Sequence, residues 1–212
     1  MAGVITALKA QKKNKDRVNV YLDGRFAFGL AAIEAARLRH GQQLSDDQAA
    51  ALQDRDEAHK AHESALRFLD YRPRSVDEIR RHLKGKGVEL DVIDEVVERL
   101  TDVGLLDDRA FARYWVENRS DFRPRGERAL RQELRLKGVP DDVIVQVLAE
   151  GHSEDEAAYR AAAAQARKVR AADPVEFRRK VEAHLVRRGF SYDAARDATA
   201  RVWCELHDDM GD

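Results

Sequence analysis

The chain has very few of the residues on which disulfide frameworks, zinc sites and membrane spans depend. One cysteine in 212 residues excludes an internal disulfide and a cysteine-based zinc site. No apolar run approaches the ~20 residues of a membrane helix, and the first residues lack the basic start and apolar core of a secretion signal. With 12 Gly, 4 Pro and 36% charged residues, the composition predicts a mostly helical, soluble, cytoplasmic protein.

Catalytic and metal-binding motifs are missing as well. There is no Gly-x-x-x-x-Gly-Lys phosphate loop, no His-Glu-x-x-His pair and no Gly-x-Ser-x-Gly elbow. His59 and His62 share a helical face without a third ligand, which favours a solvated face over a metal site. Cys204 beside Trp203 is better explained as a small packed residue than as a nucleophile. We therefore expect no enzyme, no cofactor and no bound metal.

The net charge of -1 conceals a strongly uneven distribution of charge along the chain. Residues 1–39 carry eight Lys or Arg against three acids, and residues 119–137 carry seven against three. The acids gather in other stretches, several of them at the expected starts of helices. The local charge distribution is therefore a better indicator of the partner than the net charge, and it does not exclude a polyanionic partner.

The N-terminal segment has the pattern of a β-hairpin. Apolar residues alternate with others from Val18 to Leu22 and again from Phe26 to Phe28, and Asp23-Gly24 lies between them. Asp-Gly suits a type I′ turn, which needs positive φ at both central residues. A further strand is expected over about residues 4–9, and a helix is expected from Leu30 with a stop at Gly41.

A repeat with a period of 51 residues governs the chain from about residue 60. Leu83, Leu134 and Leu185 follow one another at this interval. A fixed period indicates tandem supersecondary units. Further sets in the same register are Gly87, Gly138 and Gly189; Ile79, Leu130 and Val181; and Asp91, Asp142 and Asp193.

Each unit of the repeat is expected to hold three helices. The first covers about 61–71, 108–120 or 154–172, the second starts at a cap such as Ser75-Val76-Asp77-Glu78 and ends at the Gly, and the third begins near the Asp. The predicted fold is mainly α: an elongated array of three tandem three-helix repeats with a small N-terminal segment that contains a β-hairpin. The predicted domains are 1–55 (hairpin plus helix), 56–105, 106–151 and 152–212 (the three repeats).

Basic residues recur at fixed places in the repeat and form the candidate partner-binding or DNA-binding surface. Lys86, Lys137 and Arg188 each precede the terminating Gly, where a cation could equally well stabilise the helix dipole. A cation that returns at a regular distance suits a polyanion or a repeating protein partner. The candidate residues are Arg72, Arg74, Arg80, Lys84, Lys86, Arg123, Arg125, Arg128, Arg131, Arg135, Lys137, Arg187 and Arg188.

Two features of the basic stretch at 119–137 indicate how it could bind a partner. Arg128, Arg131 and Arg135 are spaced i, i+3 and i+7, so one helical face carries all three. Aromatic residues are sparse and do not alternate with the cations as in a single-strand stacking platform. Phe111, Tyr114 and Trp115 are better explained by core packing.

Four strings of the sequence closely resemble the RecX family, bacterial regulators of the RecA recombinase. They are ALRFLDYRPRS at 65–75, EIRRHLKGKG at 78–87, GLLDDRAFA at 104–112 and ELRLKGV at 133–139. The resemblance covers roughly residues 60–190, and the hairpin segment is similar to the N-terminal extension of longer members. It implies a cytoplasmic, non-enzymatic protein, expected to be a monomer, with some affinity for DNA. Its partner would be the RecA filament on single-stranded DNA, whose helical groove it would occupy, inhibiting ATP hydrolysis, strand exchange and co-protease activity.

Two other functions are compatible with the same helices. Two helices joined by a Gly-containing turn, as at residues 83–91, are similar to the helix-turn-helix of transcriptional regulators. The segments after each Gly begin with acids, however, which is unusual for a recognition helix. A general protein-interaction scaffold is the third alternative.

Overall fold

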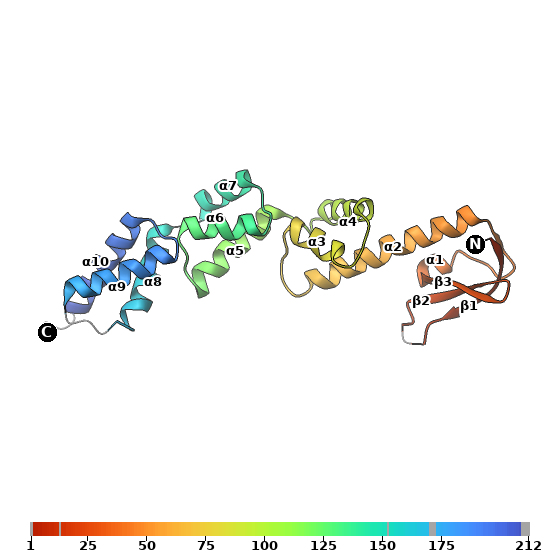
Figure 1. Cartoon of the computed structure of the whole chain (residues 1–212), viewed down its shortest axis with the longest axis horizontal. Helices are drawn as coiled ribbons and strands as arrows, with labels where there is room; N and C mark the ends of the chain where they lie inside the picture. The colour runs from red at the N-terminus through yellow and green to blue at the C-terminus, as the bar shows by residue number, and fades with distance from the viewer. Residues whose placement is uncertain (1, 13, 152, 170–172, 209–212) are drawn as a thin grey trace. The chain divides into compact units, whose positions relative to one another are not determined.

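The computed structural model describes residues 2–12, 14–151, 153–169 and 173–208. The chain forms two compact units: residues up to 72 together with 79–105, and residues 73–78 together with 106 onwards. Figure 1 shows strands β1 to β3 and the short helix α1 near the N-terminus, followed by the longer helices. The mainly helical class with an N-terminal strand segment is confirmed.

The N-terminal segment is an antiparallel sheet with the order β3-β2-β1-β4. Asp23 and Gly24, between β2 and β3, have φ values of 47° and 78°, so the expected turn with two positive φ angles is confirmed. The expected earlier strand is confirmed as β1, whereas the two-residue β4 was not expected. The strands are β1 Gly3–Ala10, β2 Arg17–Leu22, β3 Arg25–Ala31 and β4 Gln43–Leu44.

The helix expected from Leu30 to Gly41 is wrong in its extent. Leu30 belongs to β3 and is buried with Phe28, because the alternation of the hairpin continues through it. Only Ala32–Ala35 forms a helix, α1, and Ile33 within it is 66% exposed. Gly41 has a φ of 80° and precedes β4, so its conformation serves the turn into that strand.

The first long helix, α2, runs over 24 residues from Asp46 to Leu69, so a start near residue 61 is wrong. Ser45 and Gln48 form a reciprocal capping box that fixes its start. Within α2 the buried Asp56 accepts the N–H of Ala31 and pairs with Arg17 at 2.7 Å. These bonds tie α2 to the sheet, and α2 also runs unbroken through the expected boundary at 55/56. The domain boundaries stay a prediction.

Each repeat consists of three helices, and the second and third each have an apolar core of their own. All six leucine, isoleucine and valine positions that the 51-residue period singles out on the second helices have 0% exposure. The expected helix over 154–172 ends at Ala166, and residues 170–172 lie outside the described part. The remaining helices are α3 Val76–Lys84, α4 Leu90–Asp102, α5 Asp108–Phe122, α6 Glu127–Leu136, α7 Asp141–Gly151, α8 Glu154–Ala166, α9 Pro174–Arg187 and α10 Tyr192–Asp208.

The ends of the second helices follow the expected chemistry. Gly87, Gly138 and Gly189 have φ values of 79°, 77° and 87°, the left-handed conformation of a helix terminator. Asp173 accepts the N–H of Glu176, as expected for a cap. The Ser75 hydroxyl accepts the N–H of Glu78, so this side of the predicted capping box is confirmed, and the Glu78 carboxylate also pairs with Lys137 of the next repeat.

The first turn of α3 packs within the second unit against the second repeat, and we call this the first inter-repeat contact. The Ser75 hydroxyl donates to the carbonyl of Lys137 at 2.5 Å, and Lys137 Nζ lies 2.7 Å from Glu78 Oε1. The N–H of Val76 donates to Asp108 Oδ1 at 2.9 Å. An acid of the next repeat thus caps a helix that would otherwise leave this amide unsatisfied.

The first turn of α6 meets the third repeat in the same way, in a second inter-repeat contact. The N–H of Gly126 donates to the carbonyl of Arg188 at 3.1 Å, and the N–H of Glu127 donates to Glu154 Oε1 at 3.1 Å. A Cβ at Gly126 would lie 2.2 Å from the backbone of Gly189, so glycine is required for this approach. The repeats are thus joined by one kind of contact, used twice.

Candidate nucleic-acid interface

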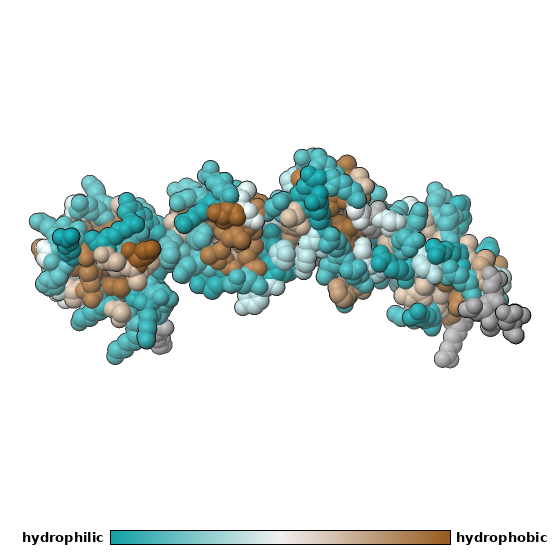
Figure 2. All heavy atoms as spheres, turned by 180° about the vertical axis from the view of Figure 1, so that it is seen from behind, coloured by the Kyte–Doolittle hydropathy of each residue, from teal (hydrophilic) through white to brown (hydrophobic). Residues whose placement is uncertain are grey.

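The structure divides the thirteen predicted cations by whether an acid is beside them. At least five lie beside a carboxylate of the described residues, which offsets their charge toward a polyanion. Figure 2 shows a mostly hydrophilic face broken by smaller apolar patches. The five pairs are Arg80–Asp94, Arg125–Glu133 at 3.6 Å, Arg131–Glu127, Arg135–Asp141 at 2.6 Å and Lys137–Glu78 at 2.7 Å.

Five other cations are exposed, and no acid of the described residues pairs with them. They are Lys84, Lys86, Arg123, Arg128 and Arg187, of which Arg128 donates to the carbonyl of Val186 at 3.1 Å. The expected basic face of α6 is thus reduced, because Arg131 and Arg135 are paired and Arg128 alone is not. Arg72 and Arg74 are half-buried.

Arginines gather around Pro124, within the second unit. The Nε of Arg188 donates to the carbonyl of Pro124 at 2.9 Å. Burial lowers the pKa of Arg188, and the charges of Arg125, Arg123 and Arg119 lower it further. These four guanidinium groups therefore share one region. Glu133 is the acid that opposes this shift, so the region keeps a positive field.

Trp115 joins this cluster on the side of α5. It packs against the core of the second repeat, as expected, but its ring also lies beneath Arg119 and Lys137, with 4.5 and 5.0 Å from the cationic atoms to the centroid. Its indole N–H and Arg119 Nε both donate to Glu133, at 2.8 and 2.7 Å. Arg119 was not among the predicted residues, although its i, i+4 spacing from Trp115 could have indicated it.

A second basic region borders a cleft of about 450 Å³ beside α9. Lys168, Arg179, Lys180 and Arg187 line it, and no acid does among the described residues. Of these four cations, Lys180 alone pairs with a carboxylate of the described residues, Glu176 at 2.7 Å. Of these four cations the sequence predicted only Arg187. The spacing of Arg179 and Arg187, eight residues apart on one helix, is the signal that could have indicated the cleft.

The cation before the terminating Gly makes different contacts in each of the three repeats. Lys86 is exposed and has no acid partner among the described residues. Lys137 bridges to Glu78, and Arg188 donates to the carbonyl of Pro124. The second and third copies therefore serve the contact with the preceding repeat, whereas the first copy does not.

Among the described residues, no group of three or more His, Cys, Asp or Glu side chains is placed to hold a metal ion. No helix in residues 2–12, 14–151, 153–169 and 173–208 is long and apolar enough to cross a membrane.

Four family profiles match the chain in order. The RecX regulatory protein N-terminal domain matches residues 3–45, and the first, second and third three-helix domains of RecX match 61–100, 107–148 and 153–199. A regulatory protein RecX of Bacillus licheniformis is 37% identical over 193 residues, which are 89% of this chain and 73% of the relative. One of Bacillus subtilis is 34% identical over 209 residues, 97% of this chain and 79% of the relative.

Two crystal structures share the fold. A regulatory protein RecX is 28% identical with a TM-score of 0.71, covering 95% of this chain and 98% of its own. RecX from Lactobacillus salivarius is 23% identical with a TM-score of 0.62, covering 69% of this chain and 97% of its own. The second likeness concerns the fold alone.

Proposed function

Because the chain belongs to the RecX family, we propose that it is a negative modulator of the RecA recombinase. It binds RecA filaments on single-stranded DNA in their helical groove and inhibits ATP hydrolysis, strand exchange and co-protease activity. It acts in the cytoplasm, as a monomer, and without catalysis of its own. The observation that carries the proposal is the match of the four RecX segments, in order, over most of the chain.

The geometry supports a nucleoprotein partner through two basic regions of the second unit. The arginine cluster around Pro124 and the cleft beside α9 both hold cations whose charge is not fully offset by acids. Exposed cations of this kind attract phosphates without regard to base sequence. We propose that Arg123, Arg179 and Arg187 face the filament or its DNA.

The helix-turn-helix alternative has less support. The third helices begin with exposed acids, Asp91, Asp142 and Asp193, where a recognition helix places the residues that enter the major groove. Acids at that place repel phosphates and favour a different use of the helices.

Binding of the chain to DNA with and without RecA tests the proposal. We expect it to sediment with RecA filaments on single-stranded DNA and to bind bare DNA more weakly, with no preference for one sequence. Tight binding to a particular duplex over random DNA at physiological salt would support a transcriptional regulator instead. Absence from the filament pellet, with the chain folded, would contradict the proposal.

The imidazole of His184 reports on occupancy of the α9 cleft. Burial lowers its pKa, and the charges of Arg188, Arg187 and Lys168 lower it further. A bound phosphate offsets those cations, so the pKa of His184 should rise towards the usual imidazole range when DNA binds. NMR titration with and without a thymidine oligonucleotide measures this.

His62 is the control for that titration. Its pKa is also lowered by burial, next by Arg99, and it belongs to the first unit. We expect its pKa to stay unchanged when the oligonucleotide binds. An unchanged pKa of His184 at saturating DNA, or equal pKa shifts of both histidines, would show that the α9 cleft does not bind the DNA.

A further inference from the structure

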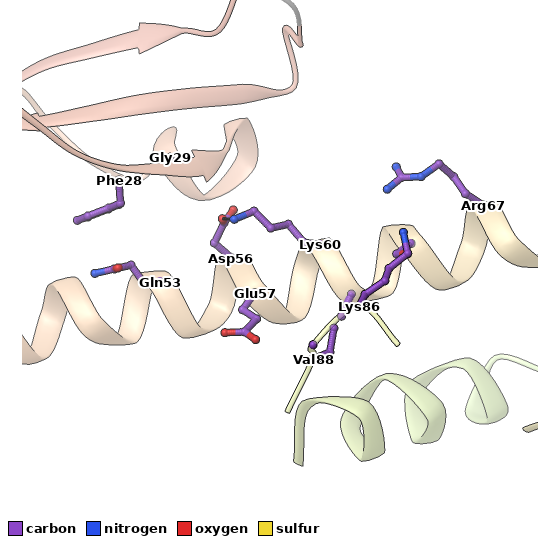
Figure 3. Close-up of a pocket in the computed structure, with 12 residues that line it drawn as sticks. Phe28, Gly29, Gln53, Asp56, Glu57, Lys60, Arg67, Lys86 and Val88 are labelled. Atoms are coloured by element: carbon purple, nitrogen blue, oxygen red, sulfur yellow. Dashed lines mark ion pairs between the residues drawn. The ribbon is translucent and has the colours of Figure 1, made fainter. Parts of the chain in front are cut away.

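We propose that the first unit holds a docking cleft for the N-terminal turn of a helix from a partner protein. The cleft has about 570 Å³ and lies between α2, β3 and the loop that ends α3. Figure 3 shows Lys86 and Val88 beside α2, near Glu57 and Lys60, with Phe28 and Gly29 of β3 on its other side. The inference goes beyond the proposed function, because it assigns a second kind of contact to a different unit.

In the second and third repeats, the loop that ends the second helix is filled by the first turn of a helix from the preceding repeat. Lys137-Gly138 receives the first turn of α3, and Arg188-Gly189 receives the first turn of α6. The equivalent in the first repeat is Lys86-Gly87, 51 residues before Lys137-Gly138. A Cβ at Gly87 would meet no described atom within 4 Å, whereas one at Gly138 would lie 2.3 Å from Asp77 Cβ. The loop therefore has the same conformation in each repeat and lacks its occupant in the first.

The acid that completes the contact is also present in the first repeat. In the first inter-repeat contact, Asp108 accepts the N–H of Val76, the first residue of α3. Glu57 stands 51 residues before Asp108 and lines the cleft together with Lys86 and Gly87. Glu57, Lys86 and Gly87 thus repeat the acid, the cation and the glycine with which the second repeat holds a helix start.

These three residues indicate which chemical groups the first turn of the partner helix must carry. Glu57 requires a free backbone N–H at the first helical residue, as Val76 supplies to Asp108. Lys86 requires a carboxylate at the third helical residue, as Glu78 supplies to Lys137 at 2.7 Å. Gly87 permits a close approach by the second residue. The occupant is a helix that begins with a small polar cap and carries Asp or Glu at its third position.

A second copy of this chain is a poor occupant. The first turns of α3 and α6 already lie against the second and third repeats, and α9 begins with Pro174, which has no N–H to donate to Glu57. Its third residue, Glu176, already pairs with Lys180 at 2.7 Å. We therefore assign the cleft to a different protein.

A peptide with the sequence of residues 73–84, stapled between positions 80 and 84 to hold the helix, is the probe. Its Ser-Val-Asp-Glu start is the one that fills the second repeat. We expect it to shift the NMR amide signals of Gly29, Lys60 and Gly87 in the full chain. Lys86→Glu should weaken binding at least about fivefold, the effect of one partly buried ion pair. Lys84→Glu, also exposed and two residues away, should leave it unchanged.

A charge exchange gives the decisive outcome. A peptide with Glu78→Lys should bind the wild-type chain weakly and bind the Lys86→Glu chain as the original peptide binds the wild type. Signals that stay unmoved at millimolar peptide, a Lys86→Glu chain that binds equally well, or an exchange without recovery would each overturn the proposal. Dimerisation of the chain that Lys86→Glu abolishes would also overturn it, since a second copy would then fill the cleft. None of these measurements involves RecA. Their results therefore test the docking cleft separately from the proposed function.

Discussion

Gly138→Ala is expected to lower the free energy of unfolding of the second unit by about 3 kcal/mol. Two costs add there. A non-glycine residue in the left-handed conformation costs ~1–2 kcal/mol, and Gly138 has a φ of 77°. The new methyl group would also lie 2.3 Å from the Cβ of Asp77, and overpacking of this kind costs ~1–3 kcal/mol.

Gly87→Ala is the matched control, because Gly87 occupies the same place in the repeat with a φ of 79° and open space beside it. It should cost only the conformational part, ~1 kcal/mol. Urea unfolding followed by the fluorescence of Trp115, in a Trp203→Phe background, measures the second unit, and the NMR amide signals of β2 and β3 follow the first. Equal losses for both variants would show that the inter-repeat contact adds nothing to stability.

Reversal of Arg123, Arg179 and Arg187 to Glu should raise the concentration for half-inhibition of RecA on the order of 30-fold. That loss corresponds to ~0.7 kcal/mol for each charge, within the usual range for exposed ion pairs. The three residues are exposed and have no acid partner among the described residues, so each is available to a phosphate. The difference from wild type should shrink as salt is raised.

The control variant reverses three arginines that already have acid partners. Arg109, Arg131 and Arg135 pair with Glu150, Glu127 and Asp141 in the same unit. The net charge changes by the same amount, so long-range repulsion from DNA is matched. We expect a much smaller rise in the half-inhibiting concentration. An equal rise in the half-inhibiting concentration for both variants, with circular dichroism unchanged, would contradict this. It would show that an acid partner does not decide which cations contribute to inhibition.

The local parts of the fold could be predicted because each depends on a few neighbouring residues. Asp23-Gly24 dictates the hairpin turn, and the 51-residue register identifies buried positions such as Leu134. The start of α2 was missed because residues 46–60 are polar and have a weak apolar period, although Ser45 and Gln48 carry the capping box. The helix expected after Leu30 was wrong because that residue continues the strand alternation.

The sequence could predict which cations belong to the candidate surface. It could not predict which of them lack an acid partner and so remain able to bind a phosphate. The sequence identifies the cations, but their partners come from distant parts of the chain: Glu78 is 59 residues from Lys137, and Glu133 is 14 residues from Arg119. No short pattern encodes such pairs, since they depend on how helices pack. The α9 cleft was missed for the same reason, because Lys168 and Arg179 come together only when α9 is folded against the segment after α8.

The most direct measurement of the central claim is the hydrolysis of ATP by RecA on single-stranded DNA as this chain is titrated in. The account predicts that hydrolysis falls at amounts well below that of RecA, because one chain that occupies the groove affects many RecA subunits. It also predicts that strand exchange falls in parallel. Unchanged hydrolysis and strand exchange at every ratio, with the folded chain present, would contradict it.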